Sequence, residues 1–256
     1  KEKAKGIDIM KGENFYSPQK PFGGDEDYIW SKDGKSIFYV CKKKAGTAYA
    51  ISTNTDIVEY NLATKKTINR TESNLGYNVA PQISPSGDLT WLQMKRDGYE
   101  ADKNDIVVSF KGIDMNLTAN WDGTVDSYQW SDDGSKVYFI AAIDGTKQLF
   151  EVNFPGMTRI AINVQQITKG NFDVNGIVGF SGSKVIVTRG DMNHAAEIYS
   201  YDLKKKDWKQ ISNINTEDYK SLELSKTERR YVTTTKKKKM LVWVILPPNF
   251  DASKKY

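Results

Sequence analysis

The feature that most constrains the fold of this chain is a short phrase, Trp-Ser-x-Asp-Gly followed by alternating apolar residues, that recurs along the sequence. It is clearest at residues 130–134, ahead of the apolar run 137–139, and it is repeated at residues 30–34, ahead of residues 37–39. Asp tolerates a left-handed backbone, and Gly takes positive φ without steric cost. The phrase therefore predicts a strand, a tight turn and a second strand.

Two less regular copies extend the repeat. Residues 83–91 carry Ser86 in place of the turn Asp, and residues 180–187 are one residue short at the turn. The serines that open the four turns lie at positions 31, 84, 131 and 181, so the intervals are 53, 47 and 50 residues. A period of this size with strand-turn-strand content is typical of propeller blades. We predict an all-β fold, a β-propeller of four-stranded antiparallel blades, with about four to five blades in this sequence.

Each period also holds two further strand-like segments. The third strands are expected at residues 56–61, 105–110, 149–154 and 197–202, where apolar residues alternate and a turn follows. The fourth strands are expected at residues 66–71, 115–118, 164–168 and 208–212, and each ends at a Thr or a Ser. Four strands per period match the requirement of a propeller blade.

Composition excludes several classes of protein. Cys41 is the single cysteine and His194 the single histidine, so no internal disulfide and no zinc site of the usual kind is expected, and no other metal site or cofactor is predicted. The net charge is +5, but the lysines form short runs at residues 42–44, 204–206 and 236–239, beside strand-like segments. Such lysines commonly solvate hairpin tips and sheet edges, so we expect no nucleic-acid partner.

No membrane segment is expected, because the longest apolar runs, residues 137–143 and 240–246, have seven residues each. The sequence begins with Lys and shows no signal peptide near it, so we expect it to be a processed or excised piece, with further blades before its first residue. Residues 1–239 are predicted to be the propeller portion. The solidly apolar run 240–246 is typical of a strand buried on both faces, as in α/β sheets, and predicts that another domain starts within residues 240–256.

The serial hairpins, and the tail Trp-Val-Ile-Leu-Pro-Pro-Asn-Phe at residues 243–250, resemble the junction between propeller and hydrolase in serine peptidases of the prolyl oligopeptidase family. The dipeptidyl peptidase and acylaminoacyl peptidase branches are the most similar. The phrase Arg-Asp-Gly-Tyr-Glu-Ala-Asp at residues 96–102 is similar to a loop that links two strands of a blade in bacterial members. TolB-like propellers share the hairpins, but not the loop together with the tail.

The resemblance implies a propeller that restricts an α/β-hydrolase active site to short peptides. It places the catalytic Ser, Asp and His downstream, so no catalytic residue is expected here. The residues agree, because the nearest approach to a Gly-x-Ser-x-Gly elbow, residues 179–183, lacks the final Gly. Whether this stretch belongs to an enzyme is left open. The expected partners are a peptide substrate and the chain's own C-terminal hydrolase domain, and assembly into a homo-oligomer is compatible with the resemblance.

The candidate substrate-binding residues are Arg96, Tyr99, Glu100 and Asp102. Long loops with fixed charge often carry recognition, and Glu100 or Asp102 is suited to pair with the amino terminus of a peptide, as the resemblance implies. The other interpretation is an internal network in which Arg96 and Lys103 pair with the acids and hold the shape of the loop.

His194 also has two interpretations. With Asp191 three residues away it has the acid that a catalytic base needs, but no motif supplies a nucleophile. The favoured interpretation is a structural loop that leads into the strand at residues 197–202.

Two function hypotheses follow. The first is the substrate-gating and substrate-selecting propeller of a serine exopeptidase or oligopeptidase; the alternative is a freestanding TolB-like or WD-type propeller that binds a protein or a glycan. A periplasmic or secreted location is expected from the family resemblance alone, and the cytoplasm is the alternative.

Overall fold

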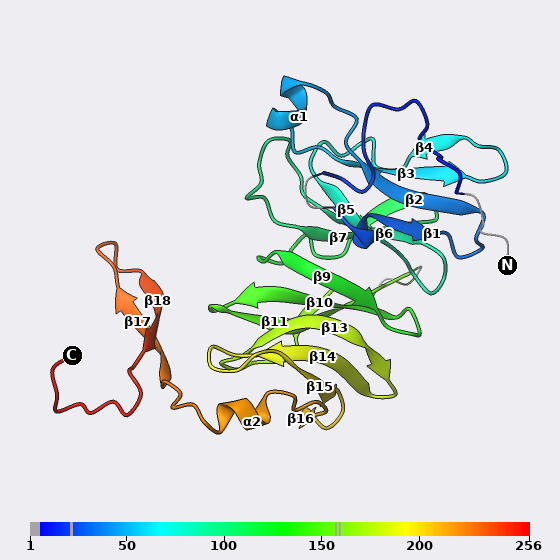
Figure 1. Cartoon of the computed structure of the whole chain (residues 1–256). Coiled ribbons are helices and arrows are strands. Elements are labelled where there is room, and N and C mark those ends of the chain that lie inside the picture. Colours follow the sequence, from blue (N-terminus) through cyan, green and yellow to red (C-terminus); the bar gives the residue numbers. More distant parts are fainter. Residues whose placement is uncertain (1–5, 21–22, 157, 159) are drawn as a thin grey trace. The chain divides into compact units, whose positions relative to one another are not determined.

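The computed structural model describes residues 6–20, 23–156, 158 and 160–256. Strands dominate this part of the chain, with one short 3-10 helix, η1 (Asp25–Asp27), and two short α-helices, α1 (Thr47–Ile51) and α2 (Thr216–Tyr219). Residues 1–120 and 121–256 form two compact units. Each unit contains two four-stranded antiparallel sheets, so the predicted all-β class and the four-stranded blades are confirmed (Figure 1).

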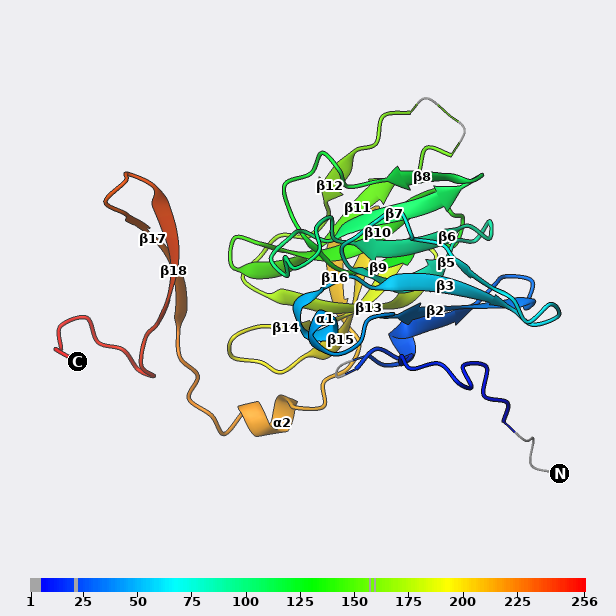
Figure 2. The same cartoon turned by 90° about the horizontal axis from the view of Figure 1, so that it is seen from above.

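The first unit holds sheets one and two. Their strands follow the chain order, and each strand is hydrogen-bonded to the next. Sheet one consists of β1 (Tyr28–Trp30), β2 (Ser36–Cys41), β3 (Asp56–Asn61) and β4 (Thr67–Asn69); sheet two consists of β5 (Asn78–Ile83), β6 (Leu89–Gln93), β7 (Asp105–Phe110) and β8 (Ile113–Asn116). Figure 2 shows strands β5 to β8 side by side in this order.

The second unit repeats the plan in sheets three and four. Sheet three consists of β9 (Val125–Trp130), β10 (Lys136–Ile143), β11 (Thr146–Asn153) and β12 (Val164–Gln166); sheet four consists of β13 (Asp173–Ser181), β14 (Lys184–Gly190), β15 (Glu197–Asp202) and β16 (Asp207–Gln210). The third strands of all four sheets lie within two or three residues of the predicted bounds. Sequence alternation is sufficient for this, because each strand buries one face.

The recurring phrase folds as predicted. In the third sheet the backbone N–H of Gly134 donates to the carbonyl of Ser131 at 2.9 Å, and Gly134 takes a φ of +68°. The Ser131 hydroxyl donates to Asp133 Oδ1 at 2.7 Å and accepts the N–H of Lys136 at 3.0 Å. Because these bonds satisfy the backbone at the tip, the turn needs no support from other segments.

A second repeated device explains why each fourth strand is followed by a hydroxyl. In each sheet, that hydroxyl accepts an N–H from the third strand: Thr71 from Ile57 at 2.9 Å, Thr118 from Ile106 at 3.0 Å, Thr168 from Leu149 at 2.9 Å and Ser212 from Ile198 at 2.8 Å. The same hydroxyls donate to the side chains of Asp56, Asp105, Gln148 and Glu197. In each blade the hydroxyl thus fastens the end of the fourth strand to the start of the third strand.

The core of each unit lies between its two sheets. In the first unit, buried side chains of β2 and β3 pack with those of β6 and β7; the cluster contains Phe38, Val40, Ile57, Leu89, Trp91 and Val107. In the second unit the corresponding cluster contains Tyr138, Ile140, Leu149, Val174, Val185 and Val187. Face-to-face packing of successive four-stranded sheets is the arrangement that a propeller requires.

The apolar run 240–246 forms the predicted strand. This strand is β18 (Lys239–Ile245), and it pairs with β17 (Thr227–Thr233) in a two-stranded hairpin. Met240 is 51% exposed and Ile245 is 62% exposed, so the described residues leave part of β18 in contact with solvent. The expectation that β18 is buried on both faces concerns the sheet of a further domain, and it stays a prediction.

Two residues lie in environments that the sequence pattern did not indicate. Trp30 and Trp130 hold the same position in the recurring phrase, but Trp30 is 54% exposed and Trp130 is 6% exposed. Lys42, expected to be solvated, is 7% exposed, because its side chain turns inward and donates to the carbonyl of Ser52 at 2.5 Å. No described helix is long and apolar enough to cross a membrane.

Candidate functional site

The loop of residues 94–104, between β6 and β7, carries the four predicted site residues. Asp97 fastens this loop to the segment that precedes β3. Its Oδ1 atom accepts hydrogen bonds from the Ser52 hydroxyl at 2.7 Å and from the backbone N–H groups of Thr53 at 2.7 Å and Asn54 at 3.2 Å. The bond from Ser52 is the main cause that lowers the pKa of Asp97. The loop is therefore held by sheet one as well as by its own ends.

Arg96, Tyr99 and Asp102 come together within this loop. The Nε atom of Arg96 lies 3.0 Å from both carboxylate oxygens of Asp102, and the backbone N–H of Arg96 donates to Oδ2 at 3.0 Å. The Arg96 guanidinium carbon lies 4.0 Å from the centre of the Tyr99 ring. Hydrogen bonding to Arg96 lowers the pKa of Asp102, so Asp102 is a charged partner inside the loop. This geometry is that of the internal network.

Glu100 has a different environment. It is exposed and accepts no hydrogen bond from the part of the chain that the structure describes. Its charge acts on two neighbours: after burial, it is the largest cause that raises the pKa of Tyr77, and it opposes the lowering of the Lys42 pKa by burial. The Lys42 ammonium also lies 4.5 Å from the centre of the Tyr49 ring. Glu100 is thus the predicted acid whose oxygens remain available to a ligand.

Lys103, the other expected partner for the loop acids, contacts residues at one end of sheet two. Its ammonium lies 2.9 Å from Asp105 Oδ1 and donates to the carbonyls of Thr118 at 3.0 Å and Ala119 at 3.2 Å. Lys103 therefore takes part in the contacts that fasten the end of β8 to the start of β7.

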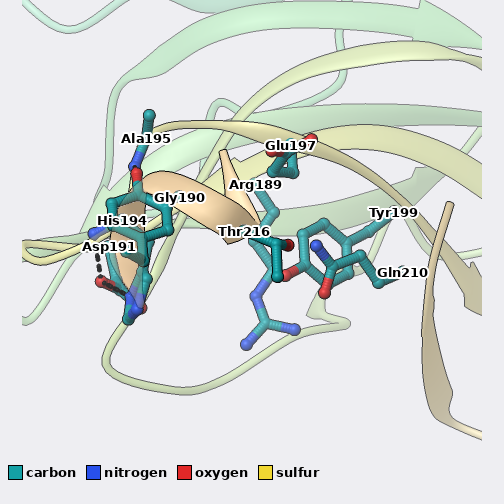
Figure 3. Close-up of a pocket in the computed structure, with 10 residues that line it drawn as sticks. Arg189, Gly190, Asp191, His194, Ala195, Glu197, Tyr199, Gln210 and Thr216 are labelled. Atoms are coloured by element: carbon teal, nitrogen blue, oxygen red, sulfur yellow. Dashed lines mark hydrogen bonds and ion pairs between the residues drawn. The ribbon is translucent and has the colours of Figure 1, made fainter. Parts of the chain in front are cut away.

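A separate pocket of about 360 Å³ lies at one end of sheet four (Figure 3). It is lined by the end of β14, the loop after it, the start of β15, β16 and the helix α2. The lining residues are Arg189, Gly190, Asp191, His194, Ala195, Glu197, Tyr199, Gln210, Thr216 and Tyr219. The pocket holds both signs of charge.

Three aromatic rings surround Arg189. Its guanidinium carbon lies 3.8 Å from the ring centre of Phe172, 4.8 Å from Trp208 and 4.9 Å from Tyr199. Burial lowers the pKa of Arg189, although an arginine remains charged at any physiological pH. Contacts with ring faces offset part of the cost of taking the cation out of water.

Asp191 and His194 form the pair that their sequence spacing suggests. The Nδ1 atom of His194 lies 2.8 Å from Asp191 Oδ1, and the dashed line in Figure 3 marks this contact. The backbone N–H of Ala195 donates to the Tyr219 hydroxyl at 2.6 Å, so the loop is held by α2. No serine or cysteine is among the described residues that line the pocket, and the loop leads directly into β15. Asp191 and His194 thus lie in a structural loop that leads into β15, as the favoured interpretation predicted.

The described residues contain no group of three or more His, Cys, Asp or Glu side chains arranged to hold a metal ion. Cys41 is buried in sheet one, and burial raises the pKa of its thiol to about 12. The thiol is therefore protonated and is no nucleophile at neutral pH.

Comparison with protein families matches residues 103–241 to the family described as "Dipeptidyl peptidase IV (DPP IV) N-terminal region". This match covers more than half of the chain. The chain belongs to this family. This assignment confirms the family expected from the hairpins, the loop and the tail, and the matched residues include sheets three and four.

Individual relatives agree with the assignment. The dipeptidyl-peptidase 5 of Porphyromonas gingivalis is 35% identical over 256 residues, which cover 98% of this chain and 36% of the relative. Among solved structures, the acylaminoacyl peptidase of Pyrococcus horikoshii has a TM-score of 0.64 at 17% identity, over 89% of this chain and 33% of that one. TolB from Acinetobacter baumannii has a TM-score of 0.52 at 15% identity, over 74% of this chain and 43% of that one. The chain thus spans about a third of the length of the dipeptidyl-peptidase.

Sequence reasoning found the loop at residues 94–104 but missed the pocket around Arg189. Arg189 and its three rings are far apart in the sequence, and no motif connects them. One signal was present, since Tyr199 and Trp208 lie on the adjacent strands β15 and β16. The missing information was that Phe172, just before β13, packs on the same guanidinium.

Proposed function

We propose that this chain is the substrate-gating and substrate-selecting propeller portion of a serine exopeptidase or oligopeptidase that cleaves short peptides. In this proposal the catalytic serine, aspartate and histidine belong to an α/β-hydrolase domain outside the 256 residues. The observation that carries the proposal is the match of residues 103–241 to the DPP IV N-terminal region. The chain's span of 36% of the dipeptidyl-peptidase 5 of Porphyromonas gingivalis is compatible with it.

The geometry of the 94–104 loop supports a division of roles among the candidate residues. Arg96 and Asp102 satisfy one another, and Tyr99 covers the guanidinium, so these three give the loop a fixed shape. Glu100 is exposed on this loop, with no partner among the described residues. We assign it the binding of the amino terminus of a peptide, because a carboxylate and an ammonium form charge-assisted hydrogen bonds.

The gating role rests on the rigidity of the site. A ligand group is selected by a fixed carboxylate only if the carboxylate cannot follow the ligand. Asp97 supplies this rigidity, since three donors from residues 52–54 converge on one of its oxygens. Peptides whose amino terminus reaches Glu100 are thereby favoured over longer ones.

The test uses the product of the complete reading frame, assayed on dipeptidyl and acyl-amino-acid chromogenic substrates with and without a serine-directed phosphonate. Cleavage that the phosphonate abolishes is expected. In Glu100→Gln we expect KM for substrates with a free amino terminus to rise about tenfold, since one charge-assisted contact is lost. KM for the N-acetylated counterparts is expected to stay unchanged.

Glu72→Gln serves as the matched control, because Glu72 is exposed, lies in the same unit and has no partner among the described residues. An equal rise of KM for free and acetylated substrates in Glu100→Gln would contradict the role of Glu100 while leaving the peptidase intact. A product without any phosphonate-sensitive cleavage would contradict the peptidase itself.

The alternative function is that of a freestanding TolB-like or WD-type propeller that binds a protein or a glycan. The likeness to TolB from Acinetobacter baumannii, which covers 74% of this chain, supports it at the level of the fold. A stop codon shortly after Tyr256 would favour this alternative. For either function we propose a periplasmic or secreted location, which fractionation of the source cells would test.

A further inference from the structure

The pocket at the end of sheet four contains a cation without a hydrogen-bonding partner. Arg189 has five N–H donors, and no hydrogen bond or ion pair to its guanidinium occurs in the described part of the chain. Its contacts are with the rings of Phe172, Tyr199 and Trp208. These rings contact the guanidinium, but they use none of its N–H donors. The N–H groups at its edge remain available to a ligand.

The two carboxylates of the pocket are, in contrast, already satisfied. Asp191 accepts the backbone N–H groups of Asn193 at 2.8 Å and of His194 at 2.9 Å, and it pairs with the His194 ring. Glu197 is 7% exposed and belongs to the fastening of sheet four, where it accepts from the Ser212 hydroxyl and from the Asn215 side chain at 3.0 Å. Neither acid is paired with Arg189, so the unused hydrogen-bonding capacity of the pocket is that of a donor.

We propose that this pocket binds a carboxylate group, with the guanidinium of Arg189 as its bidentate donor. The planar fork of a guanidinium matches the two oxygens of a carboxylate. The charge of the pocket favours a monoanion over a phosphate dianion, because Asp191 and Glu197 both lie in its wall and repel additional negative charge. A volume of about 360 Å³ admits a ligand the size of a dipeptide.

The remaining wall indicates what the carboxylate is attached to. Tyr199 and Tyr219 present rings, and Gln210 and Thr216 present groups that can donate or accept hydrogen bonds. Figure 3 shows the Arg189 side chain between the Asp191–His194 pair and Tyr199. A short peptide has both the apolar and the amide groups that such a wall can contact. The assignment involves none of the residues of the 94–104 loop, and it stands whether or not the complete protein is a peptidase.

The test is calorimetric titration of the chain with three probes of equal length. N-acetyl-alanyl-alanine offers a terminal carboxylate, N-acetyl-aspartyl-alanine amide offers a side-chain carboxylate, and N-acetyl-alanyl-alanine amide offers none. We expect the amide without a carboxylate to bind at least tenfold more weakly than the better of the two acids. The stronger acid identifies the source of the group. Equal binding of all three probes, or tighter binding of inorganic phosphate than of either acid, would overturn the proposal.

Three variants separate recognition from packing. Arg189→Met is expected to weaken binding of the better acid about tenfold to a hundredfold, and Arg189→Lys by a smaller factor, because lysine keeps the charge but loses the planar fork. Arg229→Met is the matched control, since the Arg229 guanidinium carbon also lies near a tryptophan, 5.1 Å from the ring centre of Trp243, but outside the pocket. Unchanged binding in Arg189→Met contradicts the proposal. If this variant does not fold, Arg189→Lys and the comparison of acid with amide decide.

Discussion

The hydroxyl of Thr118 donates to Asp105 Oδ1 at 2.7 Å while it accepts the N–H of Ile106 at 3.0 Å. Thr118 is 1% exposed, so its hydroxyl lies away from water. The corresponding pair in sheet one is looser, because the Thr71 hydroxyl lies 3.5 Å from Asp56 Oδ1. The same device, a hydroxyl that bonds to an acid of the third strand, thus has a shorter bond in sheet two than in sheet one.

The first prediction concerns this device. Thr118→Val keeps the shape of the side chain but leaves the buried N–H of Ile106 without an acceptor. It also removes one of the donors to Asp105, whose carboxylate keeps its contacts with Lys103 and Asn116. We expect the free energy of unfolding to fall by about 1–3 kcal/mol, the usual cost of an unsatisfied buried polar group. Urea unfolding measures this. Thr71→Val is the comparison variant and is expected to cost less; an equal loss in both would show that the distance to the acid does not matter.

The second prediction concerns the stability of the protein at acidic pH. Hydrogen bonds from Ser131 and Ser135 lower the pKa of Asp133 to about 2, below its ordinary value of 3.8. Because the folded state binds this proton less readily than the unfolded state, Asp133 stabilises the protein above about pH 4, and the contribution is lost as the pH falls toward 2. The difference in urea midpoint between wild type and Asp133→Asn is expected to shrink over this range. Asp132→Asn, one residue away and exposed, should show no such change.

The third prediction compares two tryptophans in the same sequence phrase. Trp130 is 6% exposed and its ring lies 5.2 Å from that of Phe154, whereas Trp30 is 54% exposed. Trp130→Ala should therefore lower the free energy of unfolding by about 3–5 kcal/mol, as is typical for a large core side chain. Trp30→Ala should lower it by less than about 1 kcal/mol. Thermal or urea unfolding distinguishes them, and similar losses would mean that Trp30 is covered.

The fourth prediction concerns the hairpin of β17 and β18. Gly145, in the turn between β10 and β11, has a φ of +72°, and a Cβ atom there would lie 2.6 Å from Leu241 Cδ2 and 2.7 Å from Trp243 Nε1. In Gly145→Ala these side chains must move, so trypsin should cleave faster at Lys236 to Lys239 in the tip of the hairpin. Gly112→Ala is the control, since φ is +78° there and nothing lies within 4 Å of the added atom. Equal cleavage in the two variants would mean that backbone strain alone is responsible.

The strands were predictable because their information is local. The turn phrase around Ser131 closes its own hydrogen bonds, and β11 (Thr146–Asn153) shows its buried face through simple alternation. The hydroxyl that ends each blade was also visible as a Thr or Ser at a regular place. Its partners were not, since Asp105 and Thr118 are 13 residues apart and meet only when β7 and β8 pair.

The candidate site was predictable in part. The loop phrase placed Arg96, Tyr99, Glu100 and Asp102 together, but which acid is paired depends on how the loop folds over Arg96. The contact of Asp97 with Thr53 joins segments 44 residues apart, and no sequence pattern predicts it. The apolar run 240–246 was predicted to be a strand, and it forms β18 (Lys239–Ile245), while the domain expected to begin there stays a prediction.

The sequence by itself determined the all-β class, the period of the blades, their strands and the family, because turn chemistry and alternation act over a few residues. Tertiary structure alone decided that Lys42 is buried and Trp30 exposed, that Asp102 is paired while Glu100 stays available, and that Arg189 lies among three rings. Each of these depends on which side chains from distant strands converge at one point. That convergence is fixed by the packing of sheet on sheet.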